Sequence, residues 1–464
     1  MNYTIMGFNK IFDEISKRVD HNIVFKSFID YSMQKIMNES INLSYDYDVG
    51  EFNLFEELFW YWLHLTKQEI NKTGVYDFFG IYYESYVLTK NKASSKGQFF
   101  TPQSVCDCLS DIIPSNDNAC FFYDPACGSG RMALSYSKNN PGGRVFLEDL
   151  DEFSVKMSIL NLFAHEIPGV VQWCDSLSRK VYMTWEVSGG HINVIDSVKF
   201  KEDMYDVCLA NPPYSVKWDA DKSLLKHDPR FNSYTKLAPR TKADYAFIQH
   251  ILHGLKEDGV ACIIMPQGVL FRGNSEGEIR KKILDDNLLD AVIGLPPQIF
   301  VGSGIPTVLL IFKKNRANDS IFFIDAKDDY IKAQHSKLNV LTDEHVKKIL
   351  STYTSRRDVD KYSFNATLDF IQENNYNLNI PRYVDTFEEE KEVDLKKVIQ
   401  DLEWNNREQM KINNVLNGYF CELSVPWVYE SNMSMLESNK QLLNDAHDMV
   451  QSTLDEYYVP EGGL

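Results

Sequence analysis

The feature that most constrains this chain is an alternation of short apolar runs and amphipathic helical stretches across its middle. Each apolar run has the length of a buried strand, and a turn or a helical pattern follows it. Strands that alternate with helices form mostly parallel sheets, because parallel neighbours need a crossover connection. We therefore predict an α/β fold with a doubly wound, mostly parallel seven-stranded sheet, built from "ACFFYD", "GGRVFLED", "VVQWCD", "YDVCLA", "VACIIMP", "LLDAVIG" and "PTVLLIFKK".

Helical patterns surround and connect these strands. The stretch "FNLFEELFWYWLHLTKQEI" has aromatic and aliphatic residues at helical spacing, which favours a packed core over a ligand site. The stretch "DYAFIQHILHGLKEDG" predicts an amphipathic helix that ends at Gly259. We predict a helical N-terminal domain over residues 1–96, a central α/β domain over residues 97–385, and a helical, acidic, partner-binding region over residues 386–464.

Composition narrows the class of protein. The 464 residues are 44% hydrophobic and 25% charged, which suits a globular chain of two or three domains. A run of about 18 apolar residues and a signal peptide are both lacking, so we expect no membrane segment and a cytoplasmic protein. The eight cysteines form no CxxC pair, which predicts reduced thiols and no metal site.

The charge is unevenly distributed. The formal net charge of −18 argues against a chain that grips nucleic acid strongly by itself. Residues 387–464 contain 16 acidic and 6 basic residues and account for −10 of this total. Residues 217–242 reverse the balance, with seven Lys or Arg against three Asp, and could hold a polyanion.

A glycine-rich turn follows the first predicted strand. It runs from Asp124 to Gly130 as "DPACGSG", and Gly128 and Gly130 let the backbone approach a ligand closely before a helix begins. The pattern is neither the GxGxxG of dinucleotide-binding folds nor a P-loop. A carboxylate here suits a ligand that carries a cation and hydroxyl groups, although a plain strand-to-helix turn would have the same sequence.

The next two strands also end in carboxylates. Asp149 has the position that binds ribose hydroxyls in doubly wound folds, with Glu148 as the second choice. That choice leaves Asp151 as the cap of the following helix. Asp175, in "CDSL", could accept a hydrogen bond from the exocyclic amine of an adenine ring or could cap a helix instead.

The fourth strand ends in "NPPY", residues 211–214. Prolines cannot donate to a sheet ladder, so this loop must follow the strand's carboxyl end. The Asn211 amide oxygen and the Pro212 carbonyl can together accept hydrogen bonds from an NH2 group, and the Tyr214 ring can stack on a flat heterocycle. These parts suit methylation of an amino group on a planar base, which would have to be flipped out of a duplex.

Taken together, these blocks resemble a known family. "GQFFTP" at residues 97–102, "DPACGSG", the "DLD" strand end, "DSL" and "NPPY" occur in the order and spacing of gamma-class N6-adenine DNA methyltransferases. The resemblance is greatest to the modification (M) subunit of type I restriction-modification systems. Later blocks such as "LPPQIFVGSGIPTVLLIFKK" and "YNLNIPRYVD" extend it over residues 74–385. NPPY alone is shared with glutamine-methylating and RNA-methylating enzymes, so the other blocks are what distinguish a DNA adenine methyltransferase from them.

The resemblance implies the S-adenosylmethionine-dependent methyltransferase fold, that cofactor, and methyl transfer to N6 of an adenine in DNA. The implied catalytic residues are Asn211, Pro212, Pro213 and Tyr214, with Phe300 as a candidate for a second face of the base. The implied cofactor-binding residues are Gln98, Phe99, Phe100, Thr101, Pro102, Asp124, Ala126, Gly128, Ser129, Gly130, Asp149, Asp175 and Asn211.

The resemblance also implies partners. They are double-stranded DNA, a specificity subunit that reads the sequence, a second M subunit and a restriction subunit with nuclease or translocase activity. In the family, a C-terminal helical region packs on the specificity subunit and a helical N-terminal domain helps to close on DNA. The alternatives are a stand-alone adenine DNA methyltransferase, a methyltransferase of protein glutamine or RNA, and a non-catalytic assembly subunit.

Overall fold

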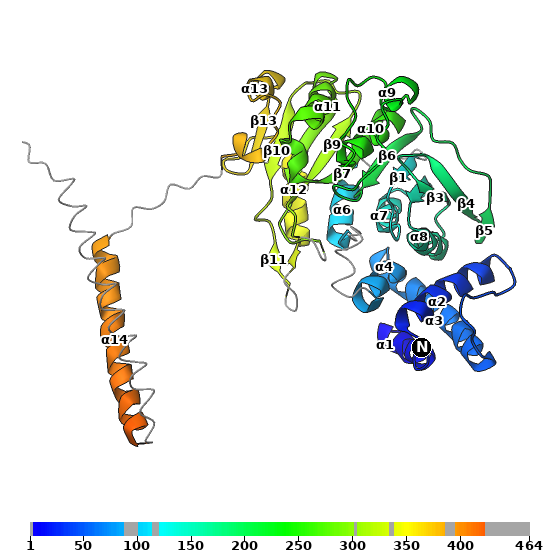
Figure 1. Ribbon diagram of the computed structural model, residues 1–464, viewed down its shortest axis with the longest axis horizontal. Helices are drawn as coiled ribbons and strands as arrows, with labels where there is room; N and C mark the ends of the chain where they lie inside the picture. Colours follow the sequence, from blue (N-terminus) through cyan, green and yellow to red (C-terminus); the bar gives the residue numbers. More distant parts are fainter. Residues whose placement is uncertain are drawn as a thin grey trace, which may run out of the picture. The chain divides into compact units, whose positions relative to one another are not determined.

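The computed structural model describes residues 3–87, 101–113, 120–300, 304–333, 338–385 and 395–422 (Figure 1). The chain divides into two compact units, Met1–Thr386 and Phe387–Leu464. Three predicted cofactor-binding residues, Gln98, Phe99 and Phe100, lie outside the described residues. Within the described residues, no helix is both long and apolar enough to cross a membrane.

Helices form the N-terminal part of the first unit. Aromatic side chains make their core, and Trp62 and Phe79 are fully buried with ring centroids 5.0 Å apart. This agrees with the prediction that the aromatic stretch packs inside the protein. The proposed domain boundary at residue 96 stays a prediction. The helices are α1 (Ile5–Ile15), α2 (His21–Ile36), α3 (Val49–Thr73), α4 (Phe78–Tyr82) and the π-helix η1 (Tyr83–Val87).

The central sheet confirms the predicted fold class. Its strand order is β13-β10-β8-β9-β7-β6-β1-β2-β3-β4-β5. The pairs from β7 through β6, β1 and β2 to β3 are parallel, and β9 is antiparallel to both of its neighbours. All seven predicted strands are present, as β1 (Phe121–Asp124), β2 (Arg144–Asp149), β3 (Gly169–Asp175), β6 (Tyr205–Ala210), β7 (Leu255–Pro266), β8 (Leu289–Gly294) and β9 (Thr307–Lys313).

Four further strands make the sheet eleven-stranded rather than seven-stranded. They extend the sheet on its two sides. Strands β4, β5 and β13 mix exposed or half-buried residues with buried ones, which weakens the apolar signal in the sequence. All five residues of β10 are buried, so this apolar run was simply not predicted as a strand. These strands are β4 (Lys180–Ser188), β5 (His191–Val194), β10 (Ile321–Asp325) and β13 (Ser363–Ala366). A separate hairpin pairs β11 (Ile331–Lys332) with β12 (Asn339–Val340).

Helices cover both faces of the sheet (Figure 1). One core cluster joins the strands to α6, α7, α8 and α12, and a second cluster joins them to α10 and α11. In β6, Val207 and Leu209 belong to the first cluster, and Cys208 and Ala210 to the second, as the alternation of side chains in a strand requires. The helices are α6 (Gln103–Ile112), α7 (Arg131–Asn139), α8 (Glu152–Ala164), α9 (Leu224–His227), α10 (Asp244–Gly254), α11 (Asn274–Asp285), α12 (Asp343–Ser355) and α13 (Leu368–Glu373), with the 3-10 turns η2 (Gln267–Leu270) and η3 (Ile380–Arg382).

One predicted helix end is wrong. Helix α10 ends at Gly254 rather than at Gly259, and β7 begins at the next residue. A Cβ atom at Gly254 would lie 2.5 Å from the Phe200 ring and 2.6 Å from the Tyr205 ring, so a side chain there would clash. Leu255 pairs with Tyr205 of β6, so the chain enters the sheet earlier than the helical pattern indicates.

The strand order places a topological switch at the centre of the sheet. From β1 the chain proceeds through β2 and β3 to one side, and then returns to β6 on the other side. In open α/β sheets the ligand crevice lies at this point, outside the carboxyl ends of the strands. The "DPACGSG" turn follows β1 and NPPY follows β6, so both loops border the same crevice.

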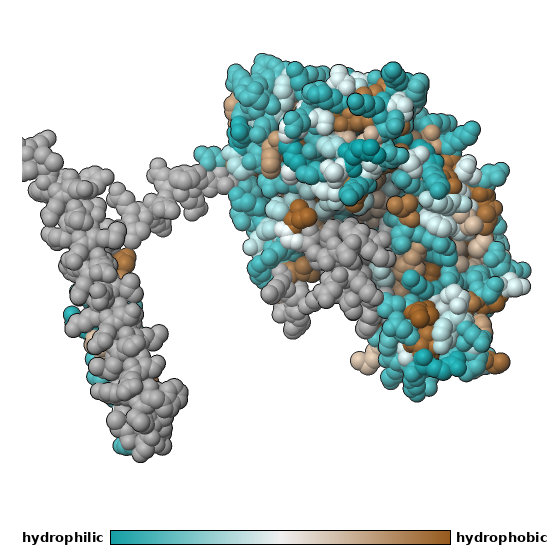
Figure 2. Space-filling view, viewed as in Figure 1, coloured by the Kyte–Doolittle hydropathy of each residue, from teal (hydrophilic) through white to brown (hydrophobic). Residues whose placement is uncertain are grey.

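The surface of the first unit is largely hydrophilic, with apolar side chains in separate spots on the face in Figure 2. In the second unit the described part is the helix α14 (Leu395–Glu422). The rest of the predicted helical region, residues 386–394 and 423–464, lies outside the described residues.

Candidate active site

The turn after β1 is built by two glycines in left-handed conformations. Gly128 has φ 53° and Gly130 has φ 83°, values that residues with a Cβ atom adopt at a cost. The Asp124 side chain accepts a hydrogen bond from the Ala126 backbone N–H at 3.0 Å. Asp149, at the end of β2, accepts one from the Gly128 N–H at 2.9 Å and so ties the two strand ends together.

Both carboxylates are poorly solvated. Asp124 is only 2% exposed, and burial raises its pKa to about 8, with a further contribution from the nearby Asp149 charge. Burial also raises the pKa of Asp149 to about 6, against the opposing effect of backbone N–H donors. Among the described residues no Lys, Arg or His forms an ion pair with either carboxyl group, so the buried Asp124 and the half-buried Asp149 favour a positively charged ligand.

The structure distinguishes Asp149 from its neighbour Glu148. Glu148 is fully buried and forms an ion pair with Arg179, with N–O distances of 2.7 and 2.8 Å, and it accepts a hydrogen bond from the Tyr123 hydroxyl at 2.6 Å. Its hydrogen-bonding capacity is used inside the protein, whereas Asp149 lines the crevice. Of the two residues, Asp149 is the one at the crevice, and its contact with a ribose stays a prediction. Asp151 caps α8 as predicted.

The turn after β3 has an acidic residue with defined backbone contacts. Asp175 Oδ1 accepts hydrogen bonds from the N–H groups of Leu177 at 3.0 Å and Ser178 at 3.2 Å. The Ser176 hydroxyl donates to the Pro125 carbonyl at 2.7 Å and links this turn to the glycine-rich turn. The side chain of Asp175 is thus held at the border of the crevice.

The NPPY loop begins directly after β6. The Asn211 Nδ2 group donates to Thr101 Oγ1 at 3.0 Å, and the Tyr214 hydroxyl donates to Asn211 Oδ1 at 2.5 Å. Ser215 continues the loop in a left-handed conformation, φ 51°, and its N–H donates to Asp244 at 2.6 Å. The amide of Asn211 is therefore oriented from both of its ends.

Tyr214 and Phe300 pack against each other. Their ring centroids lie 6.5 Å apart with an interplanar angle of 84°, an edge-to-face contact. Tyr214 is 8% and Phe300 is 1% exposed, so protein covers both rings. Their expected contacts with a base stay predictions.

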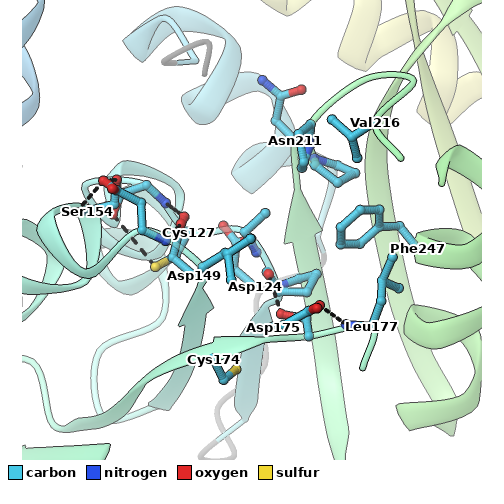
Figure 3. Close-up of a pocket in the computed structure, with 18 of the residues that line it drawn as sticks. Asp124, Cys127, Asp149, Ser154, Cys174, Asp175, Leu177, Asn211, Val216 and Phe247 are labelled. Carbon is cyan, nitrogen blue, oxygen red and sulfur yellow. Dashed lines mark hydrogen bonds between the residues drawn. The ribbon is translucent and has the colours of Figure 1, made fainter. Parts of the chain in front are cut away.

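These turns enclose a cavity of about 490 Å³, within the range of small-molecule sites. Figure 3 shows Asn211 at one end of it and Asp175 with Leu177 at the other. Pro102, Gly130, Tyr214 and Phe300 do not line it. The predicted site residues that do are Thr101, Asp124, Ala126, Gly128, Ser129, Asp149, Asp175, Asn211, Pro212 and Pro213.

Several residues of this site were not predicted. Leu177, Trp218 and Phe247 line the cavity, and none of them had a role predicted from the sequence, although Leu177 belongs to the "DSL" block. Asp77 and Arg131 form a buried ion pair behind the glycine-rich turn, at 2.7 Å. Arg131 follows the "DPACGSG" block directly, but its partner lies more than 50 residues earlier, so only the fold brings the pair together.

The residues present fit the predicted cofactor. S-adenosylmethionine has two cationic centres, ribose hydroxyls and an adenine ring, and the cavity offers the carboxylates Asp124, Asp149 and Asp175 together with the apolar Leu177 and Phe247. A sheet of this order, with acidic strand ends and NPPY at its switch point, defines the class of Rossmann-like methyltransferases. Among the members of that class, this chain belongs to the N-6 DNA Methylase family, whose sequence model matches residues 74–392.

Relatives support this assignment. The chain is 33% identical over 346 residues to a type I restriction enzyme MpnII methylase subunit from Mycoplasma pneumoniae, covering 72% of this chain and 61% of that protein. It is 30% identical over 382 residues to a type I restriction enzyme MjaVIII methylase subunit from Methanocaldococcus jannaschii, covering 78% and 64%. The match thus spans somewhat under two thirds of these relatives.

A solved structure agrees with the fold. The crystal structure of a type I restriction-modification system methyltransferase subunit from Streptococcus thermophilus superimposes with a TM-score of 0.63 at 32% sequence identity. The superposition covers 83% of this chain and 82% of that chain.

Proposed function

We propose that this chain transfers the methyl group of S-adenosylmethionine to N6 of a flipped adenine in duplex DNA, as the modification subunit of a type I restriction-modification complex. The observation that carries the proposal is that one cavity joins the three acidic strand ends to the amide of Asn211. The membership of this chain in the N-6 DNA Methylase family and the names of its relatives support the same activity.

The carboxylates would hold the cofactor. Asp124 and the turn at Gly128 would receive the end that carries the cationic groups, Asp149 the ribose hydroxyls, and Asp175 the adenine amine. When bound, the cofactor supplies a methyl group on a positively charged sulfur. Leu177 and Phe247 line the same cavity and would exclude water from the adenine ring.

The NPPY loop would hold the target base. Asn211 Oδ1 and the Pro212 carbonyl would accept hydrogen bonds from the N6 amine, which draws electron density onto the nitrogen. The Tyr214 ring would stack on the flipped base, with Phe300 supporting it from the side. A strong general base is not required, since the nitrogen can attack in line and release its proton afterwards, so positioning supplies most of the rate.

Partners would supply the DNA recognition. In residues 217–242, Lys217, Lys222, Lys226, Lys236 and Arg240 are exposed and could contact phosphates, but Arg230 is buried and forms an ion pair with Asp228. With a net charge of −18, this chain would depend on a specificity subunit, and a second M subunit and a restriction subunit would complete the complex. The stand-alone alternative is not favoured, since the relatives are named as subunits.

The substitution Asn211→Ala tests the proposal. In the complex with the specificity subunit, we expect it to lower methyl incorporation into unmodified genomic DNA by more than about a hundredfold, because an acceptor of the amine is lost. Cofactor affinity should change by less than about threefold. Mass spectrometry of the digested DNA identifies the product as N6-methyladenine.

The matched control is Asn193→Ala, at an exposed position on the edge strand β5, which should leave both quantities unchanged. Methylation of any other base or atom by the wild-type complex would contradict the proposed substrate. Loss of cofactor binding in Asn211→Ala would show that the loop serves the cofactor rather than the base.

A further inference from the structure

A buried carboxylate from the N-terminal helices lies behind the glycine-rich turn. Asp77, the N-cap of α4, is 1% exposed. Its Oδ1 accepts from the Gly80 N–H at 2.8 Å and from Asn161 Nδ2 at 2.7 Å, and its Oδ2 accepts from Ser129 Oγ at 2.6 Å and from Arg131 Nε at 2.7 Å. Four donors on two oxygens use the capacity of an ionised carboxylate.

Arg131 extends this contact toward the cavity. Besides Asp77, its guanidinium donates to Glu84 Oε2 and to the Thr101 carbonyl, each at 2.7 Å. Asp77 and Glu84 both come from the N-terminal segment, so that segment determines the orientation of the planar guanidinium. The remaining nitrogen of Arg131, which donates to the Thr101 carbonyl, then holds the backbone at Thr101, and Thr101 lines the cavity.

Thr101 connects this network to the NPPY loop. Its carbonyl accepts from Arg131, and its hydroxyl accepts from Asn211 Nδ2 at 3.0 Å. The Asn211 amide is held at its NH2 end by Thr101 and at Oδ1 by the Tyr214 hydroxyl, and the second lone pair of Oδ1 can accept from the amine of the base. If the amide rotated by 180°, its NH2 group would face the amine of the base, and two donors would oppose each other.

We propose that Asp77, Arg131 and Thr101 form a positioning network that orients the Asn211 amide for the target amine and makes methyl transfer depend on the N-terminal helices. The inference rests on the proposed function of Asn211 and adds three positioning residues to it. Asp77 and Arg131 act through Thr101, so their effect is on geometry at Asn211.

The substitution Thr101→Val tests the last link. Valine has the shape of threonine but offers no acceptor to Asn211 Nδ2. In the full chain labelled with [15N]asparagine, solvent exchange of the Asn211 side-chain amide should accelerate about fivefold or more. The Asn211→Asp variant assigns this signal by its loss, and Thr101→Ser should restore wild-type exchange because the hydroxyl returns.

The substitution Asp77→Asn tests the first link, because an amide offers one acceptor oxygen where four donors converge. Its matched control is Asp30→Asn. Asp30, in α2, forms an ion pair with Lys156 of α8 at 2.8 Å, so it also joins the N-terminal helices to a helix that covers the sheet. Neither residue lines the cavity. Asp77→Asn should accelerate Asn211 amide exchange, and Asp30→Asn should not.

In the complex, the maximal rate of methyl transfer should fall about tenfold to a hundredfold in Thr101→Val and Asp77→Asn. Unchanged Asn211 exchange in Thr101→Val, or equal effects of Asp77→Asn and Asp30→Asn, would overturn the network. If Asp77→Asn does not fold, Thr101→Val with its serine rescue decides. Exchange needs no substrate, so a wild-type complex that does not methylate adenine would refute the proposed function and leave the network to be judged by exchange.

Discussion

At the scale of single residues, the raised pKa values of Asp124 and Asp149 have a direct consequence. In the free chain these carboxyls hold protons up to about pH 8 and about pH 6. A cationic ligand stabilises the ionised forms and lowers both pKa values, so its binding releases protons. Affinity must therefore rise with pH in this range.

We expect the affinity for S-adenosylmethionine, measured by calorimetry, to increase between pH 6 and pH 8 by up to about tenfold per pH unit for each proton released. Asp124→Asn should lose most of this dependence and bind weakly at every pH. Asp30→Asn, away from the cavity, should keep the wild-type profile. An affinity independent of pH in the wild type would contradict a cation at these carboxyls.

The same shift predicts a change in stability. The pKa of Asp124 is raised in the folded chain, so its contribution to stability is fully present below its unfolded pKa of about 4 and is lost as pH rises through about 8. Without ligand, Asp124→Asn should therefore have a higher melting temperature than the wild type at pH 8 but not at pH 5. If the wild type and Asp124→Asn had equal melting temperatures at pH 8, the claim that burial of the Asp124 charge destabilises the fold would be refuted.

At the scale of elements, the NPPY loop is anchored by a buried ionic cluster. Asp244, at the start of α10, is 1% exposed and accepts from the Ser215 N–H and from Arg272, which also pairs with Glu276 at 2.9 Å. Arg272 follows η2, so two elements distant in sequence hold the loop after the Asn211 amide. Removing the arginine leaves two buried carboxylates without their cation.

Arg272→Met should lower the free energy of unfolding by about 3 kcal/mol, because the buried carboxylates would keep their desolvation cost and lose the attraction of the cation. Arg144→Met is the matched control. Its pair with Glu186, at 3.3 Å, is largely exposed, so the loss should be below about 1 kcal/mol. Urea unfolding measures both, and equal effects would contradict an anchoring role for Asp244 and Arg272.

The elements also show where sequence patterns carry information. Central strands such as β6 and β8 are buried on both faces and read as continuous apolar runs, so they were predictable. The edge strands β4 and β5 mix exposed and buried residues and carry no such run. Helix α10 ends early because the next residue, Leu255, already pairs with Tyr205 of β6, a contact that helical periodicity does not encode.

At the scale of the whole molecule, the charge bears on the proposed need for a partner. The net charge of −18 repels DNA, and the exposed lysines of residues 217–242 form a small basic segment. The described helix α14 exposes apolar side chains, and Val398, Leu402 and Leu416 lie on one side of it. An apolar helix face of this kind suits packing on another protein.

The purified chain should bind S-adenosylmethionine but methylate DNA poorly until a specificity subunit is added, with an increase of at least about a hundredfold. Radioactive methyl incorporation at moderate salt measures the difference, and increasing salt should reduce it. Robust, sequence-specific methylation by the chain alone would contradict the role of modification subunit.

The fold class, the carboxylates at three strand ends and the position of NPPY after a strand follow from the sequence, because short apolar runs and prolines act locally. Loops at the carboxyl ends of parallel strands are also expected to meet at one crevice. The tertiary structure added the lining of that cavity and the inward turn of Glu148 to Arg179. It also brought Asp77 to Arg131, Thr101 and thus Asn211. Such contacts join residues up to 110 positions apart, and strand order, which no local pattern states, makes them neighbours.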